Sequence, residues 1–360
     1  MEYTHQLLTW GQNNMLPAKR GDVADFTTYC VPMDFNVYRA TDCVVLTMHT
    51  QIDWIGQLAL NLQGKFVLHV DGKHKLHHGA WVLVTVGTHT LEYEPTRKKI
   101  VHQFRPCVYM FCKQIETGES IQVVYEAIDL IAVTFFGVKL QPGIGCSDHG
   151  RGERQAWDKC FPDIRLMGCW PHVAWGLAYG KLLHKTHPLF DSVNDDFHLL
   201  HRAMSDGMWD VFVWALGNKW GDDDAELNAL WHGRLCHPNN NWYLGFCDVP
   251  GSTPSQQAQE SWHLHGIMSR LQGELRASTS YVIEVSLAKV MTLDGALMPE
   301  MLNFELPTSW IAQEVLHKAL NIVQNKKTQV RMGCTGHDVS VRISPYQPVS
   351  GCITLYCTFC

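Results

Sequence analysis

The sequence predicts an α/β protein in which helices flank a central mixed sheet, and three observations support this. Short runs rich in apolar and β-branched residues come early in the chain. Segments with helical spacing then alternate with further short runs. With 360 residues, 46% of them hydrophobic, the chain can bury a sizeable core. Early strands that pair as a meander, followed by alternating helices and strands, give antiparallel and parallel neighbours in one sheet.

The early part of the chain supplies one helix and three strands. Residues 51–62 space their apolar side chains like an amphipathic helix. Residues 65–71, KFVLHVD, form an apolar run that ends in an acid, as a buried central strand does. Residues 80–88 and 106–113 are the second and third predicted strands, and the basic loop 97–99 lies between them.

The middle part alternates helices and strands. Apolar residues three or four apart predict a helix near Ser120, which is a plausible cap. Residues 138–148 return to strand-like character, 152–160 are helical, 164–170 form a strand and 171–185 form a helix. Three strands and a helix, followed by two strand–helix pairs, are the element order of the ribonuclease-H-like fold. We therefore predict that fold, with a five-stranded mixed sheet.

Residues 186–250 break the alternation. They are rich in Trp, Leu and His at helical spacing, and we interpret them as a helical insertion before the last catalytic helix. After it, residues 255–277 predict a long helix that starts with the Thr253–Pro254 pair and carries Glu260 near its second turn. The predicted division is an N-terminal irregular and helical segment (1–62), a catalytic core (63–185), the insertion (186–250), the closing catalytic helix (251–280) and a C-terminal extension (281–360).

Charge and composition limit the function classes. The net charge of −6 means that any contact with nucleic acid comes from local basic patches. No run approaches the roughly 18 uninterrupted apolar residues of a membrane span, so we expect no membrane partner. The first residues lack the pattern of a secretory signal. We therefore expect the thirteen cysteines to be reduced thiols or metal ligands rather than a disulfide framework.

Three acids stand where they can converge. Asp71 ends the first strand, Asp148 follows the fourth, and Glu260 lies on the helix after the insertion. The first and fourth strands are neighbours in the predicted sheet, so their ends bring the two aspartates together. Converging carboxylates in a cleft need a cation, and hard oxygen ligands select Mg²⁺ or Mn²⁺. Two such ions, about 3.5–4 Å apart, would activate a nucleophile and stabilise a leaving oxygen in phosphoryl transfer.

The stretches around these acids resemble the Mutator-like element (MULE) transposases, which are DDE-type transposases. KFVLHVDGKHK is similar to the family's first acid at the end of an apolar strand. CSDHGRGERQAWDKCFPDIRLMGCWPHV is similar to the second acid followed by a C-x-x-H motif, here Cys169 and His172. GSTPSQQAQESWHLH corresponds to the third acid, although PSQQAQ replaces the family's asparagine-rich segment. The resemblance covers residues 44–276.

The resemblance implies a transposase that cleaves and joins DNA strands in a divalent-metal-dependent reaction, with Asp71, Asp148 and Glu260 as catalytic metal ligands. It implies double-stranded DNA with the terminal inverted repeats of a transposable element as the substrate, action as a homo-oligomer, and location in the nucleus. The alternative is a domesticated, catalytically inactive DNA-binding or regulatory protein that has kept the fold and lost the chemistry.

Each of these residues also has a structural interpretation. Asp71 could be a turn residue before Gly72, and Asp148 could cap the helix that follows it. Glu260 could face solvent. His263, one turn beyond Glu260, could touch the site or be a packed core histidine. Cys169 could be a small buried apolar residue.

Three further sets of residues are candidates for binding. Four basic residues flank the proposed acids and are either contacts to DNA phosphates or ordinary surface charges: Lys73, Lys75, Arg151 and Arg154. Four residues near the C-terminus have the spacing of a structural Zn²⁺ site: Cys334, His337, Cys357 and Cys360. The acidic triplet Asp222–Asp224 looks like a metal cluster but is more typical of a solvated loop.

Overall fold

The computed structural model describes residues 30–34, 43–74, 76, 81–94, 96, 99–113, 117–148, 150–220, 224–247, 249, 252–268, 278, 281–282, 290, 330–335 and 338–343. The chain divides into two compact units, one formed by residues 1–90 and 102–304 and the other by 91–101 and 305–360. In the second unit, β8 (Val330–Thr335) pairs antiparallel with β9 (Asp338–Ile343). The predicted site residues Asp71, Asp148 and Glu260 all belong to the first unit.

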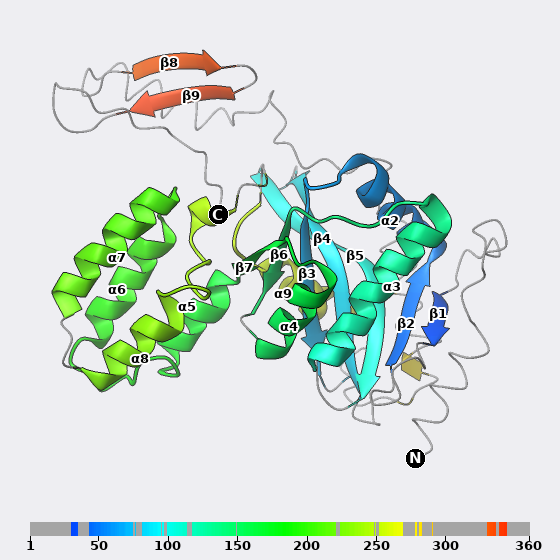
Figure 1. Ribbon diagram of the computed structural model, residues 1–360, viewed down its shortest axis with the longest axis horizontal. Helices are drawn as coiled ribbons and strands as arrows, with labels where there is room; N and C mark the ends of the chain where they lie inside the picture. The colour runs from blue at the N-terminus through cyan, green and yellow to red at the C-terminus, as the bar shows by residue number, and fades with distance from the viewer. Residues whose placement is uncertain are drawn as a thin grey trace. The chain divides into compact units, whose positions relative to one another are not determined.

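A seven-stranded mixed sheet forms the centre of the fold (Figure 1). Its strands are β1 (Cys30–Asp34), β2 (Cys43–Met48), β3 (Val67–Lys73), β4 (Trp81–Glu94), β5 (Lys99–Lys113), β6 (Ile144–Ser147) and β7 (Arg165–Gly168). They lie in the order β1-β2-β5-β4-β3-β6-β7. β3 is antiparallel to β4 and parallel to β6, which is itself parallel to β7. The five predicted strands are therefore contiguous, and β1 and β2 extend the sheet beyond β5 by two strands that we did not predict.

The core begins earlier in the chain than the predicted division placed it. Residues 43–61 supply β2 and α2 (His49–Asn61), and both contribute side chains to the main apolar core. Val45 and Ile55 are fully buried there. The helix confirms the amphipathic spacing of residues 51–62, but its apolar face packs into the core rather than forming a separate segment.

One face of the sheet is apolar and covered by helices. α2, α3 (Gly118–Phe136) and α4 (Arg151–Cys160) contribute to one buried cluster with the strands (Figure 1). Val70 of β3 and Val84 of β4 belong to this cluster. Because successive side chains of a strand point to opposite faces, Asp71 points to the other face. The proposed site therefore lies on the side of the sheet away from α3 and α4.

Two local features position α3 and α4. The hydroxyl of Thr117 accepts a hydrogen bond from Ser120 N, and Ser120 Oγ accepts one from Thr117 N, which forms a capping box. The cap of α3 is therefore Thr117, and the predicted cap Ser120 is the third helical residue. At Gly145 in β6, a Cβ would lie only 2.9 Å from the ring of Trp157 in α4. The glycine allows α4, the helix that follows Asp148 in the chain, to pack closely against β6.

The predicted helical insertion is present and has its own aromatic core. Its helices are α6 (Phe190–His201), α7 (Asp206–Trp220) and α8 (Ala225–Arg234), and α5 (Trp170–Ala178) precedes it. The rings of Phe197 and Trp242 stack with centroids 5.2 Å apart, and Trp209 meets Trp242 edge-on at 5.0 Å. α5 is shorter than the predicted helix over 171–185, because Gly180 adopts a left-handed φ of 70°.

The closing helix differs from the prediction. α9 (Gln257–Ser261) continues as the π-helix η3 (Trp262–Met268). Its cap is Gln256 rather than the predicted Thr253–Pro254 pair, so Glu260 lies in the first turn of α9. A π-helical turn is wider than an α-helical one and often marks a functional site.

Some sequence predictions concern residues outside the described ranges. They include the end of the closing helix (269–277) and most of the C-terminal extension. The proposed Zn²⁺ site stays a prediction, because the side chains of its four residues are not among those described: Cys334, His337, Cys357 and Cys360. In the acidic triplet, Asp224 caps α8 by accepting hydrogen bonds from Glu226 N and Leu227 N, as a loop residue does. Within the described part of the chain, no helix is long and apolar enough to cross a membrane.

Candidate metal centre

Asp71 and Asp148 lie at the same end of two neighbouring parallel strands. β3 and β6 pair in a register that sets His69 opposite Cys146. Two further steps along each strand lead to Asp71 and to Asp148, which directly follows β6. The first and fourth predicted strands are thus neighbours, and both acids lie at the same end of these two strands.

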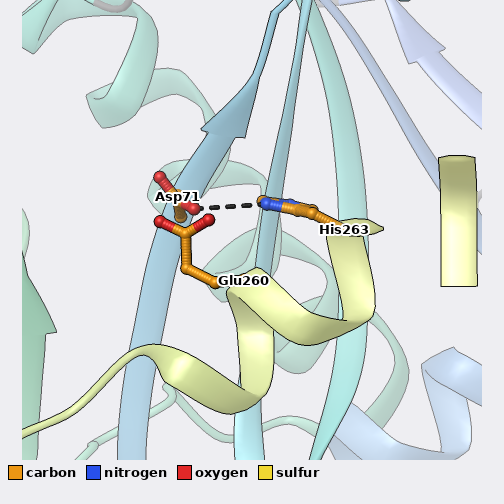
Figure 2. Close-up of side chains that lie close together, drawn as sticks. All are labelled: Asp71, Glu260 and His263. Carbon is orange, nitrogen blue, oxygen red and sulfur yellow. Dashed lines mark ion pairs between the residues drawn. The ribbon is translucent and has the colours of Figure 1, made fainter. Parts of the chain in front are cut away.

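Glu260 and His263 reach Asp71 from the closing helix, as Figure 2 shows. One potential ligand atom from each of these three residues lies within 4.8 Å of the other two. Nδ1 of His263 is 3.2 Å from Oδ2 of Asp71. Oε1 of Glu260 also lies 3.6 Å from Nε2 of His172. The carboxylate of Asp71 and the Glu260–His263 pair, far from it in sequence, are therefore close enough to share one cation.

Among the residues that the structure describes, the group of nearby ligand atoms does not include Asp148. Its side chain is exposed, and its Oδ1 accepts a 2.8 Å hydrogen bond from Gly150 N at the start of α4. Its charge also interacts with the guanidinium of Arg234 in the insertion. The structure thus brings Asp71 and Glu260 together. Asp148 instead bonds to the backbone of Gly150, the N-cap residue of α4, and no side chain caps that helix.

The C-x-x-H pair lies next to the acids, as the sequence predicts. Cys169 is buried, and its Sγ accepts a 3.2 Å hydrogen bond from Gln256 N at the cap of α9. Burial raises the pKa of the Cys169 thiol to about 12, so the side chain is neutral near pH 7. His172 contacts Glu260, which lies one helical turn after Gln256. The pair therefore connects the end of β7 with α9 and bears on the position of Glu260.

Two fully buried glutamines fix α9 to the sheet. Nε2 of Gln256 donates to the carbonyl oxygens of Val70 (2.6 Å) and Cys146 (3.3 Å), where β3 and β6 separate. Nε2 of Gln259 donates to the carbonyl oxygen of Thr85 in β4 (2.9 Å) and to its hydroxyl (3.0 Å). A single turn of helix is thus hydrogen-bonded to three adjacent strands. Sequence reasoning assigned no role to these glutamines, although polar residues three apart before a proposed catalytic acid were a signal that could have found them.

The π-helix is anchored over β5 by an aromatic contact. The ring centroid of Trp262 lies 5.5 Å from that of Phe104 and 5.8 Å from that of Tyr109. This contact sets the position of the next residue, His263, whose side chain is only 1% exposed. The histidine is a core residue and a neighbour of the acids at once, so both interpretations of it are correct.

The electrostatics of the site reflect two carboxylates held close together. The pKa of Glu260 is raised above its ordinary value, first by burial and then by the negative charge of Asp71. His263, His172 and Lys73 act in the opposite direction and lower the pKa of Glu260. The ionised form of Glu260 is therefore less favourable in this site than in water.

The residues fit a divalent cation. Nδ1 of the buried His263 makes no hydrogen bond, although it lies beside the carboxylate of Asp71. A buried ring nitrogen without a partner costs free energy. A cation held by Asp71 and Glu260 would satisfy this nitrogen and neutralise both carboxylates.

The four basic residues proposed as DNA contacts differ in their surroundings. Lys73 ends β3 two residues beyond Asp71, and so on the same face of the sheet. Nη2 of Arg154 donates a 3.2 Å hydrogen bond to the carbonyl oxygen of Pro238 in the insertion. Lys75 and the side chain of Arg151 lie outside the described residues. Lys73 is therefore the basic residue that the structure relates most directly to the acids.

No protein-family model matches the chain, and a search of curated proteins finds no match. The functional interpretation therefore depends on the geometry of the site and on the resemblance around the three acids.

We expect the substitution Gln256→Ala to destabilise the protein by about 1–3 kcal/mol, because it leaves two buried carbonyl groups without their donor. Equilibrium unfolding in urea, followed by tryptophan fluorescence, measures the change. Gln257→Ala is the matched control, since Gln257 is exposed, and it should change the free energy of unfolding by less than about 0.5 kcal/mol. Equal losses in the two variants would contradict the bracing role of Gln256.

The substitution Glu260→Gln should stabilise the metal-free protein increasingly as the pH rises. The raised pKa of Glu260 means that its contribution to stability is present below the unfolded-state pKa of about 4.3 and is lost as the pH rises through the folded-state pKa. Melting temperatures of both proteins in EDTA, at several pH values from about 4 to 8, measure this difference. The exposed Glu226→Gln provides the control. A difference between wild type and Glu260→Gln that does not grow with pH would contradict the raised pKa of Glu260.

Proposed function

We propose that the protein is a DDE-type transposase whose ribonuclease-H-like core catalyses divalent-metal-dependent phosphoryl transfer on double-stranded DNA. The observation that carries the proposal is the meeting of Asp71 and Glu260, whose ligand atoms lie within 4.8 Å of each other. One comes from the end of a central strand and the other from the helix after a helical insertion. These are the two elements that carry the first and last acids in the family that the sequence resembles.

The topology supports the same proposal. The strands β5-β4-β3-β6-β7 form a continuous mixed sheet with an antiparallel part on one side of β3 and a parallel part on the other. This arrangement is compatible with a ribonuclease-H-like core. It sets the strand that carries Asp71 at the point where the direction of pairing changes, next to the strand that precedes Asp148.

The protein side chains have distinct roles in the proposed reaction. Asp71 and Glu260 would hold a divalent cation, and a bound cation would lower the pKa of the attacking water or 3′-hydroxyl and stabilise the leaving oxygen. Lys73, on the same face of β3, is in position to contact a DNA phosphate. Asp148 supplies a third carboxylate at the same sheet edge, and its exposed side chain can turn toward the site when substrate binds.

The second candidate function is that of a transposase-derived DNA-binding protein without catalytic activity. The observation that favours it is the position of Asp148, whose carboxylate bonds to Gly150 N instead of joining the other two acids. The two functions differ in one measurable property, since both predict DNA binding and only the first predicts cleavage.

We expect the wild-type protein to cleave plasmid DNA that carries the inverted repeats flanking its gene, in the presence of Mg²⁺ or Mn²⁺. Asp71→Asn, Asp148→Asn and Glu260→Gln should each lower the cleavage rate by at least about two orders of magnitude, because each removes a cation ligand. Gel analysis of nicked and linear products measures the rate, with circular dichroism as the test of folding.

Asp158→Asn is the matched control, because Asp158 is exposed on α4, and it should cleave at the wild-type rate. DNA binding by the wild type without cleavage in either cation would favour the inactive protein. Full cleavage by a folded Asp71→Asn protein would contradict the proposed site.

A further inference from the structure

A chain of polar contacts links the buried His263 to the strand next to the site. Its Nε2 lies 2.8 Å from the hydroxyl of Thr85. Its Nδ1 lies 3.2 Å from Oδ2 of Asp71, the contact marked by the dashed line in Figure 2. Thr85 is fully buried and pairs with Asp71 across β3 and β4. The ring of His263 is thus held between a hydroxyl on one side and a carboxylate on the other.

The hydrogen bonds of Thr85 bear on which nitrogen of His263 carries the proton. A hydroxyl has one donor and two acceptor positions. Its hydrogen can point to the backbone carbonyl of Asp71, which lies 3.4 Å away and can only accept. One acceptor position takes Nε2 of Gln259, at 3.0 Å. The orientation of that amide is set because the same nitrogen also donates to the carbonyl of Thr85.

Nε2 of His263 lies 2.8 Å from the same hydroxyl, and which of the two donates depends on the tautomer of the ring. When the hydroxyl donates to the carbonyl of Asp71, Nε2 of His263 donates to the hydroxyl. With the proton on Nε2, the Nδ1 atom carries a lone pair. The other tautomer would place an N–H on Nδ1, where no hydrogen-bond geometry exists despite the 3.2 Å distance to Asp71. That arrangement would leave a buried donor unsatisfied. The network thus presents a nitrogen lone pair toward the two carboxylates.

We propose that Nδ1 of His263 is a direct ligand of the divalent cation bound by Asp71 and Glu260, and that Thr85 and Gln259 are positioning residues which fix its tautomer and orientation. A hydrogen bond from the second ring nitrogen is what metal-binding histidines ordinarily make. The inference rests on the cation-binding part of the proposed function and is independent of DNA cleavage.

The donor set has a consequence for metal selectivity. Carboxylate oxygens alone suit Mg²⁺, whereas an imidazole nitrogen favours first-row transition ions. A site of two carboxylates and one imidazole is therefore expected to bind Mn²⁺ more tightly than Mg²⁺. His263 is the residue that makes this difference.

Electron paramagnetic resonance of Mn²⁺ bound to the full chain tests the proposal, because electron spin echo modulation detects a directly bonded ¹⁴N nucleus. We expect wild type to bind Mn²⁺ with ¹⁴N modulation. His263→Gln should lose the modulation and bind Mn²⁺ at least about tenfold more weakly, with a smaller change in Mg²⁺ affinity. His172→Gln and the exposed His265→Gln are controls that should keep the ¹⁴N signal, since His172 lies near Glu260 and His265 lies on the same helix.

Thr85→Val provides a second variant that keeps His263 and does not depend on His263→Gln folding. It should retain ¹⁴N modulation and bind Mn²⁺ several-fold more weakly, because Nε2 loses its partner. Mn²⁺ binding without ¹⁴N modulation in the wild type would overturn the proposal, and so would a signal that His172→Gln abolishes. A ¹⁴N-coupled Mn²⁺ site in a protein that does not cleave DNA would support this inference while contradicting the catalytic function.

Discussion

The hydrogen bonds of two buried amides hold the helix that carries Glu260 against the strand that carries Asp71. Gln256 and Gln259 attach the closing helix to backbone and side-chain oxygens of three adjacent strands, and the next residue, Glu260, faces Asp71 as a result. Two like charges would separate if the helix were free to move. The position of the site thus depends on polar contacts made by two fully buried side chains.

The two faces of the sheet contribute differently to the contact between the closing helix and the strands. The apolar face of the sheet, packed against α2, α3 and α4, supplies the burial that stabilises the whole unit. The opposite face keeps Asp71, Thr85 and the closing helix together. Burial and then the charge of Asp71 raise the pKa of Glu260, so the ionised carboxylate is unfavourable there without a cation. Such a departure from local stability is common at functional sites, and a bound cation would reverse its sign.

Much of the fold could be predicted from the sequence, since runs such as 65–71 combine β-formers with burial and the segments between them have helical spacing. The strands β1 and β2 were missed. β2 pairs with β5, far along the chain, and β1 pairs with β2, although the β-branched run CVVLTM was a local signal for β2. The π-helix was missed because periodicity assumes regular α-helical turns. It results instead from tertiary contacts such as that of Trp262 with Phe104.

The site was partly predictable for a similar reason. Asp71 and Glu260 could be found because an acid at a strand end and one after an insertion form a pattern along the chain. The role of His263 depends on the tautomer that Thr85 and Gln259 impose, and their contacts exist only in three dimensions. The outward orientation of Asp148 follows from its bond to Gly150 N, which a sequence pattern permits but does not require.

The central claim is that Asp71, Glu260 and His263 form one cation site on the polar face of the sheet. An anomalous difference map from crystals grown with Mn²⁺, collected near the manganese absorption edge, tests it most directly. The account predicts a peak about 2.1–2.3 Å from an oxygen of each carboxylate and from Nδ1 of His263. A map with no peak there, or a peak coordinated by other residues while Asp71 and Glu260 stay apart, would contradict it.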